Sequence, residues 1–495
     1  MEFARRLGLR YIWIDSLCII QDDPKDWEQE SAVMAEIYIN CLVTIAASTS
    51  SNPNGGLFTK PGDESESVRI ATVQTADGQS APILARWRSD HDPSNASRYP
   101  LAKRGWVLQE TLLSPRTIYF IGSEILCECR AGHTCECGRG MEEGDLRKRD
   151  FWQTPIADTG PDHDNLKWHN IIREYSSMQL TYGSDTLPAL SGLARQWCNS
   201  GFGQYLAGLW RQSLRQDLAW EVSGTKGLRA RPWRAPTWSW ASLDSTDIMY
   251  KCSGLSIPKR LSAEVVEAYC EPTGINPTGA IKAGTLVVRG KAIDAKAYCY
   301  FSIPSLESND ASPESDDASS EWETISSDVE QDSESAYSIE YLPCHMLATG
   351  PATYQWYPDI LYWDPSKRQD FIASDFTVKV LLLANADPGC LNEIEELWVC
   401  LVLRPNPEDY NTYERIGLFR MEASDPSPEA EKLIHPKRAD ARELRSKRIG
   451  WWQNQTHNHG EDKLDMVRQL SIRRELNRRF FQLLLDAPFT DYTIV

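Results

Sequence analysis

The sequence has no apolar run long enough to cross a bilayer, and its N-terminal residues contain no hydrophobic signal-peptide core. It also lacks an excess of positive charge, because 52 lysines and arginines stand against 70 aspartates and glutamates, a formal net charge of -18. Nucleic acids and anionic membranes attract clustered positive charge, so neither is expected as the main partner. These absences predict a cytoplasmic protein with no membrane span and no nucleic-acid partner.

The motifs of several common enzyme classes are also missing. There is no G-x-G-x-x-G loop and no G-x-x-x-x-G-K-S/T loop, so neither a standard Rossmann turn nor a P-loop is predicted. A G-x-S-x-G elbow and an H-E-x-x-H pair are absent as well. The sequence therefore gives no support to these nucleotide-binding and hydrolase classes.

The 13 cysteines are an odd number spread over 495 residues, which is unlike the dense framework of a disulfide-rich secreted domain. One group is closer together: Cys127-x-Cys129 is followed by Cys135-x-Cys137, with His133 between them. Four soft ligands at this separation suit tetrahedral zinc, although zinc knuckles usually have C-x2-C spacing. We predict inert thiols in a strand-turn-strand segment and no metal, with zinc held by the four cysteines as the alternative.

What is present at the start of the chain predicts an α/β arrangement. Residues 9–15 form a short apolar run rich in β-branched and aromatic side chains, as expected of a buried parallel strand. A helix is predicted from residue 24 or 25 to 40, and a second strand at residues 42–47. Strand, helix and strand in this order predict a βαβ unit on a parallel sheet.

The remainder of the chain divides by its patterns into further parts. Residues 131–245 carry helical patterns rich in Trp, Leu and Tyr, which predict a helical extension. Residues 246–304 and 341–460 show short alternating patterns, which predict a β-rich C-terminal domain. Between them, residues 305–340 are dominated by Ser, Asp and Glu, and we predict a disordered acidic insertion. A C-terminal helix is predicted within residues 461–495.

Two acidic residues near the N-terminus are candidates for chemistry. Glu30 falls inside the apolar stripe of the predicted helix at about 100° per residue, and an inward carboxylate needs a donor or has a raised pKa. Such carboxylates occur at active sites and in structural ion pairs, and the sequence leaves both open for Glu30. Asp15 ends the predicted first strand, where α/β sheets bind ligands, although a turn or helix cap explains it equally well.

A second cluster lies at residues 104–110, Arg-Gly-Trp-Val-Leu-Gln-Glu. Arg104 has the geometry to clamp a carboxylate or phosphate, and Trp106 can stack on a flat ring. An internal ion pair of Arg104 with Glu30 or Asp15 is the structural alternative. The candidate ligand-binding residues are therefore Asp15 and four members of this cluster, Arg104, Trp106, Gln109 and Glu110.

These segments together resemble the fungal heterokaryon-incompatibility (HET) domain, which we place at residues 1–130. The resemblance rests on Tyr11-Ile-Trp-Ile-Asp-Ser-Leu-Cys-Ile-Ile-Gln-Asp-Asp, Trp27-x-x-Glu30, Met34-x-x-Ile37-Tyr38, and the cluster at 104–110 with Leu113-Ser-Pro-Arg116. Motifs similar to the region that usually follows this domain extend it to about residue 244: Leu180-Thr-Tyr, Asp185-Thr-Leu-Pro-Ala-Leu-Ser-Gly-Leu-Ala, Ala207-Gly-Leu-Trp and Ala235-Pro-Thr-Trp-Ser-Trp-Ala-Ser.

The resemblance implies a TIR-like parallel-sheet fold and a role in non-self recognition and programmed cell death, with protein partners and self-association. HET domains normally begin with a strand carrying a Leu-Ser-Tyr-x-Trp-Gly-like motif, and this sequence starts beyond it, so that strand is expected to be missing. Some TIR domains hydrolyse NAD with a glutamate on a helix, and Glu30 matches that position best. An NAD-cleaving hydrolase, with NAD as its substrate and no certain cofactor, is therefore one alternative function. A non-catalytic interaction scaffold is the other.

Overall fold

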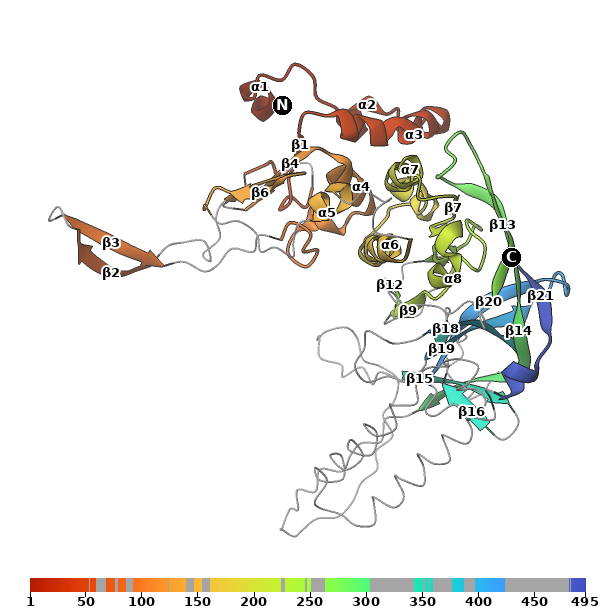
Figure 1. The fold of residues 1–495 in the computed structure, drawn as a ribbon. Helices are drawn as coiled ribbons and strands as arrows, with labels where there is room; N and C mark the ends of the chain where they lie inside the picture. The colour runs from red at the N-terminus through yellow and green to blue at the C-terminus, as the bar shows by residue number, and fades with distance from the viewer. Residues whose placement is uncertain are drawn as a thin grey trace, which may run out of the picture.

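The structure is a computed structural model, and it runs from N-terminal helices through a helical middle region to a C-terminal β barrel (Figure 1). The predicted acidic insertion at 305–340 lies outside the residues it describes. The described residues are 1–52, 54–58, 68–75, 79–85, 92–122, 124–138, 147–153, 161–223, 228–244, 247–250, 263–302, 342–349, 352–355, 357–358, 376–386, 397–422, 480 and 482–495.

The N-terminal residues form three helices, α1 (Glu2–Arg6), α2 (Asp15–Cys18) and α3 (Pro24–Asn40). The predicted helix at residues 24 or 25 to 40 is confirmed by α3. This helix begins where it does because the Asp23 carboxylate accepts the backbone N–H of Lys25 at 2.9 Å, and proline suits the first turn.

The strand predicted at residues 9–15 is wrong. Residues 9–14 belong to no strand, and Asp15 is the first residue of α2. An apolar run becomes a strand only where a neighbouring strand pairs with its backbone, and none pairs here among the described residues. The side chain of Tyr11 is accordingly 87% exposed, while the Trp13 ring packs edge-on against Tyr38 on α3, with ring centroids 5.8 Å apart. The predicted βαβ unit is therefore not formed.

The N-terminal sheet has four strands in the order β1-β4-β5-β6. Its members are β1 (Thr44–Ala46), β4 (Arg116–Ile121), β5 (Glu124–Cys129) and β6 (Gly132–Cys135). The second predicted strand is confirmed by β1, which pairs in parallel with β4, whereas β4, β5 and β6 pair antiparallel. The sheet is thus mixed, and a TIR-like parallel sheet is not confirmed. Two further strands, β2 (Val68–Gln74) and β3 (Ser80–Ala85), form a hairpin that projects from the molecule (Figure 1).

Two helical elements, the 3-10 turn η2 (Pro100–Lys103) and helix α4 (Gly105–Leu113), lie between β3 and β4 in the chain. A region with further helices follows the sheet: α5 (Arg147–Gln153), α6 (Pro161–Ser176), η3 (Gly183–Asp185), η4 (Pro188–Leu190), α7 (Ser191–Asn199), η5 (Arg211–Ser213), α8 (Leu214–Asp217) and η6 (Trp240–Ser242). Short paired strands lie among them: β7 (Tyr205–Leu206), β8 (Leu209–Trp210), β9 (Glu221–Ser223), β10 (Leu228–Arg229), β11 (Leu243–Asp244) and β12 (Asp247–Met249). None of the helices among the described residues is both long and apolar enough to cross a membrane.

The predicted β-rich part is organised by one strand of 22 residues, β14 (Ile281–Ser302). Its backbone pairs with four others, and β14-β18-β19-β20-β21 close into a ring because β21 pairs with both β14 and β20. The strands of this part are β13 (Glu264–Pro272), β15 (Leu342–Thr349), β16 (Ala352–Gln355), β17 (Tyr357–Pro358), β18 (Phe376–Ala386), β19 (Leu397–Pro405), β20 (Tyr413–Glu422) and β21 (Phe489–Ile494).

The end of the chain contains a short helix and a strand. Residues 482–486 are helical and lie in the segment predicted to contain a C-terminal helix, and residues 489–494 form β21. The backbone groups of β21 are satisfied by the ladder with β14. Residues 461–479 lie outside the described part of the chain.

The helical region and the barrel share one hydrophobic core. Successive residues of β18 and β19 point to opposite faces, so Leu381 and Leu401 join a core with Trp168 and Leu193, while neighbours such as Val380 enter a second core. Burial on both faces explains why these strands are continuous apolar runs. The shared core also reaches Ala35 on α3, and it therefore connects the N-terminal helices to the barrel through the helical region.

A buried arginine reinforces that junction. Arg415 on β20 is fully buried, and its two terminal nitrogens donate to the backbone oxygens of Leu218 and Trp220, each at 2.6 Å. Its guanidinium also stacks on the Trp220 ring at 3.4 Å. The barrel strand is thus fastened to the helical region by hydrogen bonds and by stacking.

Candidate functional site

Helix α4 and its N-cap Arg104 form the cluster at residues 104–110, and the indole of Trp106 reaches the helical region. The Nε1–H of Trp106 donates to the Asp185 carboxylate at 3.1 Å, and Asp185 is nearly buried. Burial raises the pKa of Asp185, while hydrogen bonds from Trp106 and Ser184 oppose that shift by favouring the carboxylate. The predicted ring-stacking residue is therefore engaged in an internal hydrogen bond.

The next polar residue of the cluster is equally engaged. The Oε1 atom of Gln109, which is fully buried, accepts the backbone N–H of Gly192 at 2.6 Å. Gly192 is the second residue of helix α7, and a Cβ atom there would lie 2.5 Å from both the Ala35 Cβ and the Gln109 Oε1. Only glycine lets α3, α4 and α7 approach this closely.

The last residue of the cluster faces the N-terminal helices. Glu110 accepts a hydrogen bond from the Tyr38 hydroxyl on α3, and the charges of Arg104 and Asp15 act on it. We call Asp15, Tyr38, Arg104 and Glu110 the Glu110 cluster. Three of the five predicted ligand-binding residues therefore come together here, whereas Trp106 and Gln109 point toward other partners.

Burial and several charges act on Glu110 at once. Burial is the largest influence and raises the pKa of Glu110, the Tyr38 hydrogen bond and Arg104 lower it, and Asp15 raises it further. The pKa of Tyr38 is raised as well, first by burial and then by Glu110. Glu110 and Tyr38 are packed between two helices, and only Arg104 and Asp15 are exposed.

Glu30 is not part of this cluster. It lies on α3 one turn before the buried Met34, and its side chain is half-buried. Its helix neighbour Glu36 pairs with Arg195 at 3.6 Å, while no hydrogen bond or ion pair of Glu30 is found within the described part of the chain. The side chain of Glu30 is thus only partly turned toward the protein interior, the direction that the helical pattern predicted for it.

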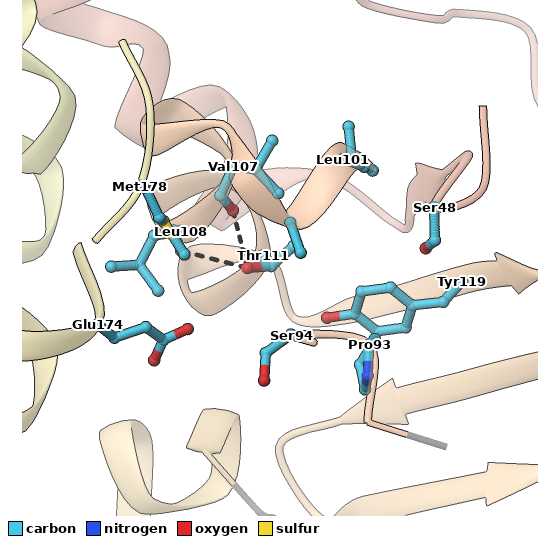
Figure 2. Close-up of a pocket in the computed structure, with 11 residues that line it drawn as sticks. Ser48, Pro93, Ser94, Leu101, Val107, Leu108, Thr111, Tyr119, Glu174 and Met178 are labelled. Carbon is cyan, nitrogen blue, oxygen red and sulfur yellow. Dashed lines mark hydrogen bonds between the residues drawn. The ribbon is translucent and has the colours of Figure 1, made fainter. Parts of the chain in front are cut away.

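A small cavity lies beneath α4 (Figure 2). Its volume is about 20 Å³, room for about one water molecule and far less than a dinucleotide needs. The buried Ser48 hydroxyl in its wall has no hydrogen-bond partner among the described residues, which suits a bound water. Neither Glu30 nor any predicted ligand-binding residue lines it, and its lining consists of Ser48, Pro93, Ser94, Leu101, Ala102, Val107, Leu108, Thr111, Tyr119, Glu174 and Met178.

The sheet beside this cavity buries a lysine that sequence reasoning missed. Lys148 on α5 donates to the Thr117 hydroxyl at 2.7 Å and lies 4.0 Å from the Glu128 carboxylate. Burial lowers the pKa of Lys148 to about 8, against the opposing charge of Glu128. Glu128 in turn accepts the Tyr119 hydroxyl at 2.8 Å. Periodicity gives no signal for Lys148, because its partners come from strands that the sequence does not align with it.

The four cysteines considered for zinc lie on the hairpin of β5 and β6. Cys127 and Cys129 point to one face of β5, whereas the register pairs Cys135 with Leu126 on the other face. Cys127 is exposed and Cys135 is buried. The hairpin therefore separates the four cysteines into two pairs.

The motif at residues 207–210 also packs against the motif at residues 235–242. The Ser239 hydroxyl donates to the backbone oxygen of Ala207 at 2.6 Å, and the Trp168 indole donates to the oxygen of Gly208 at 2.9 Å. A Cβ at Gly208 would lie 2.7 Å from the Trp240 ring. The segments at 207–210 and 235–242 thus fit together as closely as those at 104–110 and 185–192.

Comparison with known proteins identifies the N-terminal part. Residues 1–110 match the family model described as heterokaryon incompatibility protein (HET). The resemblance found in the sequence is therefore confirmed over these residues, and the motifs from residue 113 onward lie beyond the matched range. No curated protein and no solved structure matches the chain.

Proposed function

Since residues 1–110 carry an HET domain, we propose that this chain is a fungal incompatibility and cell-death factor that acts in the cytoplasm through protein association. In this proposal the N-terminal regions of several copies associate before the cell dies. In this account the domain works as an interaction module, and the helical region and barrel hold it in position.

The observation that carries the proposal is that the polar atoms of the motif residues form hydrogen bonds inside the protein. Trp106, Gln109 and Glu110 bond to Asp185, Gly192 and Tyr38 inside the protein. Side chains bound to internal partners hold elements together, and they are not available to a small molecule without breaking those bonds. The motif is therefore best explained as a set of internal contacts that help join the HET domain to the helical region.

A different set of motif residues faces solvent. Within residues 7–42, eight large apolar side chains are exposed, and several belong to the segment that resembles the HET core. We infer that these side chains form one patch, since contiguous exposed apolar surface marks protein interaction sites. These residues are Leu7, Tyr11, Ile12, Leu17, Ile20, Trp27, Val33 and Leu42.

The NAD-cleaving alternative has less geometric support. A glycosidic cleavage needs a carboxylate beside a pocket that holds the ribose and nicotinamide. Glu30 is half-exposed on α3, and the cavity beneath α4 is too small for a nucleotide and is not lined by Glu30. We keep NAD consumption as the measurement that would reverse the proposal.

The test is expression of the full chain in filamentous fungal cells, with cell death scored over time. The variant is Tyr11→Glu with Leu17→Glu, which places charges at positions that are 87% and 68% exposed. The matched control is Tyr410→Glu with Leu228→Glu, at positions that are 80% and 60% exposed and lie outside residues 7–42. Glu30→Ala is tested in parallel, both for death and for NAD consumption by purified protein.

We expect death with the wild type, with the control pair and with Glu30→Ala, and loss of death with Tyr11→Glu and Leu17→Glu. NAD consumption that disappears in Glu30→Ala, together with loss of death in that variant, would replace the association proposal with the enzyme. Equal loss of death in both surface variants would show that added charge alone is responsible, and would also reject the proposed surface.

A further inference from the structure

The hairpin of β5 and β6 brings three metal-ligating side chains together at its open end. One ligand atom each of Glu124, Cys135 and Cys137 lies within 4.8 Å of the others. Glu124 and Cys135 are buried, whereas Cys137 is exposed. This group is separate from the Glu110 cluster and contains only two of the four cysteines that the sequence suggested.

Strand register explains the grouping. Leu126 pairs with Cys135, and the Glu136 backbone N–H donates to the Ile125 oxygen at 3.1 Å, so the antiparallel ladder continues one step beyond β6. Two residues from the paired position on each strand, Glu124 and Cys137 then face each other on the same side as Cys135. The one-residue offset turns Cys127 and Cys129 to the opposite face.

The ligand types in the group suit a zinc ion. The Glu124 carboxyl is 3% exposed, and the Cys135 thiol donates to it at 3.2 Å. The backbone N–H of Cys137 also points to the Cys135 sulfur. Two thiolates and a carboxylate oxygen form a ligand set that zinc accepts in tetrahedral sites.

We propose that Glu124, Cys135 and Cys137 bind one zinc ion at the end of the β5–β6 hairpin. The three protein ligands leave one tetrahedral position for water, on the side where Cys137 meets solvent. Binding releases the thiol protons to solvent as the two sulfur–zinc bonds form, with no oxidation or reduction. The ion ties the end of β5 to the residues after β6.

Zinc binds cysteine as the thiolate, so both thiols must release their protons on binding. The measured affinity is therefore expected to fall as the pH is lowered.

The experiment measures zinc per chain by elemental analysis after the full-length protein is purified with zinc and dialysed. Cobalt substitution gives a second readout, because thiolate ligands produce an intense charge-transfer absorption. The variants are Cys137→Ser, chosen because Cys137 is exposed and its change is least disruptive to folding, and Glu124→Gln. The matched control is Cys127→Ser, an exposed cysteine of the same hairpin on the other face.

We expect about one zinc per chain in the wild type and in Cys127→Ser. Cys137→Ser is expected to bind zinc at least about a hundredfold more weakly and to lose about half of the cobalt–thiolate absorption per bound cobalt, because only the Cys135 thiolate remains. Glu124→Gln is expected to weaken binding while keeping that absorption. No zinc in folded wild type would overturn the proposal, as would equal losses in Cys127→Ser and Cys137→Ser. A disulfide between Cys135 and Cys137 in protein purified with zinc would also reject it.

Discussion

The Trp106 indole N–H donates to the Asp185 carboxylate at 3.1 Å, across 79 positions of sequence. Each residue belongs to a different motif of the chain, and Gln109 and Gly192 of the same two motifs form a second bond nearby. The two motifs are therefore one interface within the protein. Changes at that interface should act on stability before they act on any chemistry.

Trp106→Phe tests this bond directly. The substitution keeps most of the ring and removes the N–H, so a largely buried carboxylate loses its indole donor, and we expect the free energy of unfolding to fall by about 1–3 kcal/mol. Chemical denaturation measures the change. The matched control is Trp233→Phe, because Trp233 is 50% exposed, and that variant is expected to leave stability nearly unchanged.

The same pair makes a prediction about pH. Burial raises the folded-state pKa of Asp185, so the folded chain holds this proton more tightly than the unfolded chain, and ionisation costs stability as the pH rises through that pKa. Loss of the Trp106 donor raises this pKa further. The penalty of Trp106→Phe should therefore be larger at neutral pH than at an acid pH well below the ordinary carboxyl pKa, where the carboxyl is protonated in both states. A penalty that grows toward low pH would contradict this assignment.

Gly192→Ala tests the close approach of three helices. The added Cβ would lie 2.5 Å from Ala35 and from Gln109, so the helices must separate or the hydrogen bond must lengthen. We expect a loss of about 1–3 kcal/mol, measured by denaturation. Asn199→Ala, at an exposed position of the same helix, is the control and should change stability little. Equal effects of the two substitutions would reject the close approach.

Lys148 gives a second pH prediction with the opposite sign. Its pKa is lowered to about 8 by burial, from an ordinary value of 10.5. Between these values the unfolded chain holds the proton and the folded chain does not, so the free energy of unfolding rises with pH. Over that window the wild type should gain up to about 3 kcal/mol relative to Lys148→Gln. Lys103→Gln, at an exposed lysine, should show no such difference, and a flat profile in the wild type would contradict the burial of Lys148.

Arg415→Lys tests the junction between the barrel and the helical region. Lysine cannot reach two carbonyl oxygens as a planar fork, and it loses the stacking on Trp220. We expect a loss of about 2–4 kcal/mol in the free energy of unfolding. Arg289→Lys is the comparison, because Arg289 pairs with Asp491 at an exposed site, and little change is expected there.

The sequence predicted local elements better than their pairing. Helix α3 was predictable because Asp23 and Pro24 mark its start, and strands β18 and β19 because their apolar runs are buried on both faces. Residues 9–14 have an equally strand-like pattern, but a pattern cannot say whether a neighbouring strand exists to pair with it. For the same reason the sequence did not show that residues 489–494 form β21 and pair with β14.

The candidate site shows the same limit. Chain order placed Arg104 and Glu110 in one motif, and the structure adds Tyr38 and Asp15 to Glu110. Sequence could not show that Trp106 and Gln109 point to Asp185 and Gly192, because those contacts depend on how α4 and α7 pack. The sequence offered four cysteines as a zinc site only as the alternative to no metal. Strand register instead brings two of them together with a glutamate, a residue that the spacing of cysteines does not point to.

The central claim is that residues 7–42 form the surface through which the chain associates. Sedimentation velocity of the purified full-length protein over a range of concentrations measures this directly. We expect the wild type and the pair Tyr410→Glu with Leu228→Glu to self-associate, and the pair Tyr11→Glu with Leu17→Glu to do so at least about tenfold more weakly. A wild type that stays monomeric at every concentration, or association unaffected by Tyr11→Glu and Leu17→Glu, would contradict the account.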